Sequence, residues 1–439
     1  MANTLFPIQA YLTEDALPLL SNSFGVTRTM SKEYSDYKVA LKRGARGATT
    51  LLPLPTRSRN INSIPFDATT EGSFAERQFS ITVNKQKSNP FMIEDVESAV
   101  YSAPGIVTKN TKGAINEVAS AIEQDNILSI ATAGYRFFGD VSVTSDQLQT
   151  VGEVDEAVNR FQGFGSPAGG MAYFVVPYVA SSRILQTAYQ QFVNKRNDEL
   201  SLKGEIGMLG GVEDTMFMKS SLLPVHTAGT AANDAINTST GYDIVSVTPN
   251  AAASGGLEAD NTSVVVLENM TVGTTIVADD MIDIGVLNTA DPLRFLTFTG
   301  YALSESHVQG RVITGGTVDG SGDLTITIAP ALIYDGTATN PYQNLNRDIV
   351  AGTDTMRIAK SHRAGLLYFG DYMYFMSPDL PDTEPFPSSS MRDELSGCTL
   401  RAYYGTAGIG SGLKQFVHDS YTGAAGAPEG AARLLFPLN

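Results

Sequence analysis

An abrupt change of composition after Pro224 constrains this fold more than any other feature of the sequence. Residues 225–350 are rich in Thr, Val, Ile, Asp and Gly and hold 14 acidic residues, three arginines and no lysine, a formal charge of -11. Short strand-like runs such as Ser263–Leu267 and Leu324–Ile328 are separated by turns such as Asp319–Gly322. Such spacing is typical of an all-β barrel or sandwich. Because both flanks show a mixed helix and strand pattern, we predict an α+β protein with an inserted all-β domain.

The flanking sequence predicts one long helix and several shorter elements. Apolar residues recur at helical spacing over Asn110–Phe138, which is expected to be the longest helix, and again over Val151–Gln162. Met171–Val176 is an apolar run that predicts a buried strand. Ala48–Leu54 and Arg77–Val83 have strand character and enclose a segment rich in Pro, Asn and Gly, so they predict a long extended hairpin.

These patterns divide the chain into six parts. They are an N-terminal arm (1–47), an extended loop with its flanking strands (48–93), a long spine-helix region (94–140), the first part of the main body (141–224), the inserted β-barrel (225–350), and the second part of the main body with a C-terminal return (351–439). The apolar C-terminal end, Leu434–Leu438, is expected to be docked and not free.

Bulk properties exclude several classes of protein. Cys398 is the only cysteine, so no intrachain disulfide can form and a reducing compartment is expected. The longest apolar run, Met171–Ala180, is about half the ~20 residues that a membrane-spanning helix needs. The formal charge of -16 argues against a general nucleic-acid binder, whereas a charged fraction of only 17% favours a surface that contacts other subunits.

Short segments spread along the whole chain occur in a characteristic order. They are the strand Ala48–Leu54, its return at Phe79–Val83, Glu94-Asp95 before the long helix, Tyr173-Phe174 through Pro177, Ser221–Pro224, Asp279–Val286, Val318–Pro330, and Leu395–Cys398 through Ala402–Gly405. This order resembles the coat proteins of short-tailed bacteriophages, in the subtype of the tailed-phage and herpesvirus capsid fold that carries an inserted β-barrel. The acidic, lysine-free insertion and the tyrosine-rich late segment depart from the family pattern.

The resemblance implies a structural role without chemistry or cofactors. It implies a major capsid protein, made in the bacterial cytoplasm and located in the virion, with peripheral and axial domains that form the hexamers and pentamers of an icosahedral shell. It also implies several partners: other copies of the chain, a scaffolding protein during assembly, a portal protein at one vertex, a decoration protein, and enclosed double-stranded DNA through non-specific contacts. No membrane partner is implied.

Three groups of charged residues are candidate contact sites. Glu14 and Asp15 lie in the arm, where related coat proteins meet their scaffold, although acids at a helix start also favour the helix dipole. Residues 28–59 carry a charge of +6, and this basic arm is expected to contact neighbouring subunits in preference to DNA. Its candidates are Arg28, Lys32, Lys38, Lys42, Arg43 and Arg46.

The third group, Asp279, Asp280 and Asp283, is expected to lie at an interface of the insertion or in solvent; a bound cation is the less favoured alternative. No catalytic or metal-binding motif stands out. The four histidines are scattered singly, and Asp319, Ser321 and Asp323 begin like a calcium loop that has Pro330 where a glutamate is needed. Two other classes stay open at this point: a β-rich virion appendage or adhesin, and a hydrolytic enzyme with paired carboxylates.

Overall fold

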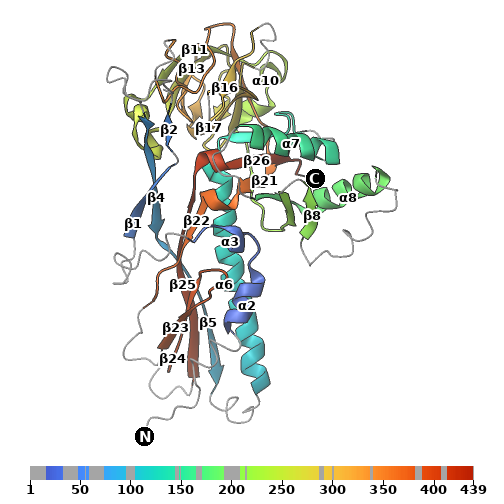
Figure 1. The fold of residues 1–439 in the computed structure, drawn as a ribbon, viewed down its shortest axis with the longest axis vertical. Coiled ribbons are helices and arrows are strands. Elements are labelled where there is room, and N and C mark those ends of the chain that lie inside the picture. The colour runs from blue at the N-terminus through green and yellow to red at the C-terminus, as the bar shows by residue number, and fades with distance from the viewer. Residues whose placement is uncertain are drawn as a thin grey trace, which may run out of the picture. The chain divides into compact units, whose positions relative to one another are not determined.

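The protein is an α+β chain that divides into two compact units (Figure 1). The computed structural model describes residues 16–32, 48–54, 56–58, 74–94, 104–143, 148, 150–164, 171–191, 208–212, 215–285, 291–298, 301–336, 340–380, 388–406 and 413–438. The first unit comprises residues 1–50, 80–129 and 370–425, and the second comprises residues 51–79, 130–369 and 426–439. In the described part of the chain, no helix is long and apolar enough to cross a membrane.

The first unit is built around a long helix and an antiparallel sheet (Figure 1). Its elements are α2 (Leu17–Ser23), α3 (Val26–Thr29), β5 (Lys85–Glu94), α6 (Pro104–Ala133, which continues into the second unit), β22 (Met373–Met376), β23 (Ser388–Arg392), β24 (Thr399–Thr406) and β25 (Leu413–Gly426). The strand order is β22-β25-β24-β23, and β5 also pairs with β25. The β5–β25 ladder runs without interruption from Lys85–Thr422 to Glu94–Leu413.

The long helix was predicted correctly in kind but not in its limits. The expected apolar face, Ile115, Val118, Ala119 and Ile122, is buried. The helix begins earlier than predicted, at Pro104, and ends at Ala133 instead of Phe138. A Cβ on Gly134 would lie 2.5 Å from the carbonyl oxygen of Ala431, and the next residues form a strand that pairs with the C-terminal strand. Close tertiary packing therefore overrides the local helical pattern.

The second unit contains a mixed sheet with strand order β6-β26-β21-β7-β9-β8. These strands are β6 (Arg136–Phe138), β7 (Ala172–Val176), β8 (Met208–Val212), β9 (Thr215–Lys219), β21 (His362–Phe369) and β26 (Ala431–Phe436); β10 (Val225–His226) also pairs with β21. Every residue of β26 is buried, which confirms docking for Leu434–Phe436 of the predicted end, whereas Leu438 is 47% exposed.

Two helices belong to this unit, α7 (Val151–Gly163) and α8 (Tyr178–Gln191). Helix α7 matches its prediction, and Thr150 and Glu153 form a reciprocal capping box at its start. Helix α8 begins directly after Pro177. The Ser181 hydroxyl donates to the Tyr178 carbonyl within the helix.

Six strands close into a β-barrel, in the order β15-β20-β11-β13-β19-β17 and back to β15. They are β11 (Tyr242–Pro249), β13 (Ser263–Glu268), β15 (Met281–Ile284), β17 (Leu303–Thr314), β19 (Leu324–Ala329) and β20 (Thr355–Ile358). The predicted α+β class with a β-barrel is thereby confirmed. Strand β20 lies beyond residue 350, the predicted end of the insertion, because closure requires a strand between β15 and β11.

Short elements complete the second unit and the loop segment. In the barrel region they are β14 (Thr275–Ile276), β16 (Arg294–Leu296), β18 (Gly316–Thr317), α10 (Ala235–Ser239) and the 3₁₀ turns η3 (Thr230–Asn233), η4 (Ala251–Ser254) and η5 (Glu258–Asp260); η6 (Gly370–Tyr372) and η7 (Pro428–Gly430) lie later in the chain. The extended segment contains β1 (Ala48–Pro53), β2 (Arg57–Ser58), β3 (Phe74–Ala75) and β4 (Arg77–Val83). Strands β1 and β4 are neighbours, β2 pairs antiparallel with β3, and β12 (Gly256–Leu257) joins the free edge of β4.

Candidate functional sites at the barrel joint and the N-terminal segment

The three predicted aspartates lie on or just before β15, where the barrel meets the mixed sheet. Ile282 and Ile284 point into the barrel core, so Met281 and Asp283 face outward. Met281 packs in an apolar cluster with Phe137 and Val141 of the β6 region, Leu435 of β26, and Ala359, which directly follows β20. We call this contact region the barrel joint.

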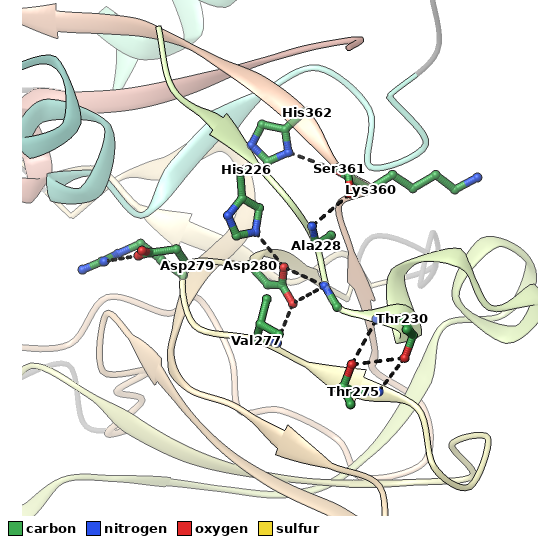
Figure 2. Close-up of polar contacts among 12 residues, drawn as sticks. His226, Ala228, Thr230, Thr275, Val277, Asp279, Asp280, Lys360, Ser361 and His362 are labelled. Atoms are coloured by element: carbon green, nitrogen blue, oxygen red, sulfur yellow. Dashed lines mark hydrogen bonds and ion pairs between the residues drawn. The ribbon is translucent and has the colours of Figure 1, made fainter. Parts of the chain in front are cut away.

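Asp280 is fully buried and binds three groups from two segments of the chain (Figure 2). Its Oδ1 lies 2.8 Å from Nε2 of His226, and its Oδ2 accepts the backbone N–H groups of Val277 at 2.9 Å and Gly229 at 3.3 Å. A buried carboxylate with several donors holds them in one arrangement. Asp280 thus fixes the chain that enters the barrel to the turn that precedes β15.

Two histidines lie directly opposite each other at the entrance to the barrel. His226 on β10 pairs in register with His362 on β21, and their ring centroids are 5.3 Å apart. Nδ1 of His362 lies 2.8 Å from the carbonyl oxygen of Lys360, while its buried Nε2 has no hydrogen-bond partner. Burial lowers the pKa of His362 to about 3, and the nearby positive charge of Arg433 adds to this effect. His362 is therefore neutral at neutral pH.

Arg433 connects β26 with the turn before β15. Its guanidinium is buried and donates to the carbonyl oxygen of Ala131 at 2.8 Å and to that of Asp279 at 3.1 Å. Burial lowers the pKa of Arg433 to about 10, which still leaves it charged at neutral pH. The carboxylate of Asp279 accepts from Arg311 at 2.6 Å, so the backbone and the side chain of Asp279 each bind an arginine.

Asp283 is buried with one carboxyl oxygen unpartnered. Its closest cation is Nη2 of Arg357, 3.9 Å from Oδ2, and its buried Oδ1 has no hydrogen-bond partner. Burial raises the pKa of Asp283 to about 7; Arg357 opposes this shift, and the neighbouring carboxylate of Asp140 adds to it. The carboxyl group consequently changes charge near neutral pH.

These positions bear on the prediction that the three aspartates lie at an interface of the insertion or in solvent. Asp280 and Asp283 are buried inside their own chain and present no surface to another subunit. The side chain of Asp279 is 39% exposed, so the interface prediction stays a prediction for this residue. Across the residues the structure describes, no group of three or more His, Cys, Asp and Glu could hold a metal ion.

In the first unit, Glu123 on α6 binds the N-terminal segment. Its carboxylate accepts the backbone N–H groups of Gly25 at 3.0 Å, Val26 at 2.5 Å and Thr27 at 3.1 Å, as well as the Thr27 hydroxyl. The side-chain amide of Asn126, one turn further along α6, donates to the hydroxyl oxygen of Thr27 at 2.8 Å. Glu123 was not among the predicted site residues. The feature of the sequence that indicates it is an acidic residue directly after Ile122, on the apolar face of a helix.

The same segment continues along the edge of the sheet. The backbone of Ser31 donates to the Met373 carbonyl at 2.7 Å and accepts from Phe375 at 3.0 Å. The ammonium group of Lys32 binds the carbonyl oxygen of Leu395, and burial lowers its pKa. Arg28 is exposed. The remaining predicted contact residues, Glu14, Asp15, Lys38, Lys42, Arg43 and Arg46, lie outside the described residues.

No protein-family description matches the chain, and no curated protein matches it. Solved structures align over most of its length. The capsid of Ralstonia phage GP4 aligns with a TM-score of 0.43 and 5% identity over 94% of this chain and 89% of that chain. A chain of Mycobacterium phage Che8 aligns with a TM-score of 0.42 and 8% identity over 93% and 90%. The capsid of Cyanophage P-SCSP1u aligns with a TM-score of 0.41 and 12% identity over 90% and 84%.

Proposed function

We propose that this chain is the major capsid protein of a tailed double-stranded DNA bacteriophage, and that its barrel is the inserted domain of the short-tailed subtype. The order of parts along the chain carries the proposal. An anchored N-terminal segment and an extended strand pair precede the 30-residue helix α6 and the mixed sheet. The chain then leaves that sheet at β10, builds the barrel and returns at β21. The sequence resemblance predicts these parts in this order.

Exposed apolar side chains on the extended segment and on helix α6 favour a protein that binds copies of itself. Leu51 on β1 is 52% exposed, and Leu128 on α6 is 45% exposed. Ordering a chain segment costs about 1–2 kcal/mol per residue, and a two-stranded segment recovers little of this within its own subunit. Contacts with neighbouring copies would supply the rest, repeated by the symmetry of hexamers and pentamers.

The partner assignments belong to the same proposal. Glu14 and Asp15 are proposed to contact a scaffolding protein, and the basic residues of the arm are proposed to contact neighbouring subunits and, non-specifically, the enclosed DNA. A portal protein at one vertex and a decoration protein complete the set. The chain itself is proposed to perform no chemistry and to bind no cofactor.

The test is assembly with and without the neighbouring scaffold gene. We expect co-expression to yield closed shells or capsomers by negative-stain microscopy and sedimentation velocity. Deletion of residues 1–45 should leave a folded subunit that does not assemble, and Leu51→Lys should weaken assembly. The matched control is Val272→Lys on the barrel, where the residue is 58% exposed. Rods in place of shells would favour a virion appendage, and an inert monomer at high concentration with scaffold present would refute the proposal.

A further inference from the structure

The barrel binds the return strand of the extended segment through its backbone. Strand β12 pairs parallel with β4, with Gly256 opposite Arg77 and Leu257 opposite Gln78. The carbonyl oxygen of Arg77 in turn accepts the N–H group of Leu54, in the outgoing strand, at 2.8 Å. Both strands of the extended segment are therefore connected to one short strand of the barrel region.

The side chain of Arg77 adds three contacts on the barrel side. Its Nη2 donates to the carbonyl oxygen of Ala253 at 3.1 Å, and its Nη1 lies 3.6 Å from a carboxylate oxygen of Glu258. The guanidinium also lies over the ring of Tyr342, 5.4 Å from the centroid. The side chains of Arg77 and Glu258 are only 15% and 13% exposed, and burial raises the pKa of the Glu258 carboxyl to about 8; the carboxylate of Glu429 adds to this shift and Arg77 opposes it.

Tyr342 extends the contact to the preceding residue. Its hydroxyl accepts the N–H group of Glu76 at 3.1 Å and lies 3.4 Å from the Glu76 carbonyl oxygen, while its ring packs on a small apolar cluster of Ala253, Ala331 and Ile333. Gly256 has a positive φ of 84°, which lets the barrel backbone bend toward β4. The contact thus combines a backbone pair, a largely buried contact between arginine and glutamate, and a ring on a packed support.

We propose that the barrel is a fixed support for residues 51–54 and 76–78 of the extended segment, and that Arg77 is the residue that holds residues 76–78 on it. These residues are then ordered before any second chain binds, which lowers the ordering cost of a later contact. The contacts lie within one chain, so they do not depend on shell formation and can be tested on unassembled protein.

Hydrogen exchange of the full-length chain, read by mass spectrometry, tests the proposal. Arg77→Met removes the guanidinium and keeps an unbranched side chain. We expect exchange in peptides covering residues 51–54 and 255–258 to become at least about tenfold faster, since opening of the contact exposes their amides. Exchange in barrel strands β13 and β19 should stay unchanged. The matched control is Arg311→Met, a barrel arginine of similar exposure whose partner is Asp279, and it should leave residues 51–54 and 255–258 protected.

Tyr342→Phe provides a milder second variant, because it removes only the hydroxyl that binds Glu76. We expect about threefold faster exchange at residues 74–78 with an intact barrel. If Arg77→Met also accelerates exchange throughout the barrel, Tyr342→Phe decides the outcome. The proposal is overturned if Arg77→Met keeps a folded barrel and leaves the protection of residues 51–54 and 255–258 unchanged. It is also overturned if Tyr342→Phe leaves the protection of residues 74–78 unchanged.

Discussion

Replacing Asp283 by asparagine should make the protein more stable at alkaline pH and leave it almost unchanged at acidic pH. The carboxyl group is buried beside β20, its Oδ1 has no hydrogen-bond partner, and burial raises its pKa from 3.8 to about 7. The folded state therefore keeps a proton that the unfolded state has already released between about pH 4 and pH 7. The stability associated with this proton is present below about pH 4 and is lost as the pH rises through 7.

The size of the effect follows from the shift. A difference of about three pKa units, at about 1.4 kcal/mol per unit, gives an upper limit of about 4 kcal/mol at pH 8. Arg357 is the nearby cation, and its ion pair with the ionised Asp283 is lost in the variant, so we expect a net gain of about 1–3 kcal/mol. Asparagine has nearly the same size and cannot ionise, which isolates the charge from the packing.

Calorimetric unfolding at pH 4 and pH 8 measures this difference. We expect Asp283→Asn to raise the melting temperature of the second unit by about 3–9 °C at pH 8 and by less than about 2 °C at pH 4. The control is Glu268→Gln, an exposed acidic residue on the barrel, which should change neither value appreciably. An asparagine variant that is less stable than the wild type at pH 8, or that shows the same difference at both pH values, refutes the reasoning.

Three further predictions concern other buried groups. His362→Asn should reduce the loss of stability on acidification, measured by thermal unfolding between pH 7 and pH 4. Burial lowers the pKa of His362 to about 3, so below about pH 6.5 the unfolded chain binds a proton that the folded chain does not bind. Glu123→Gln should make trypsin cleavage after the exposed Arg28 about tenfold faster, because the Glu123 carboxylate accepts three backbone N–H groups of that segment. The control Glu117→Gln, elsewhere on α6, should leave the cleavage rate unchanged. Cys398 is buried with its pKa raised to about 11 by burial, so its thiol should not react with Ellman's reagent at pH 8 until urea unfolds the protein, and rapid reaction of the native chain would contradict the burial.

Patterns in the sequence predicted those helices and strands whose caps and buried faces are formed by residues close together in the chain. Helix α7 carries its capping box and its apolar face within 14 consecutive residues, and the prediction placed it to within one residue. The barrel strands alternate between buried and exposed positions, as in β13 and β19, so their composition and turn spacing were sufficient to predict a β domain. The buried face of α6 was predicted for the same reason.

The features that the predictions missed depend on contacts between residues that are far apart in the sequence. Arg136–Phe138 has a helical pattern, but it forms a strand because β26 offers a parallel edge about 300 residues later. Strand β20 lies outside the compositional boundary of the insertion, and only closure of the barrel assigns it there. Glu123 resembles any acidic residue on a helix until Gly25, Val26 and Thr27 direct three N–H groups toward it.

The sequence by itself determined that this protein contains a long helix, a docked C-terminal strand and a separate β-rich segment, because periodicity and composition act over neighbouring residues. The tertiary structure alone decided which charges are buried. Asp279, Asp280 and Asp283 are alike in sequence, yet the first remains partly exposed, the second binds groups from two segments, and the third has a buried oxygen without a hydrogen-bond partner. Burial and partner distance set the free energy of each charge, and both depend on where the folded chain places groups that are far apart in sequence.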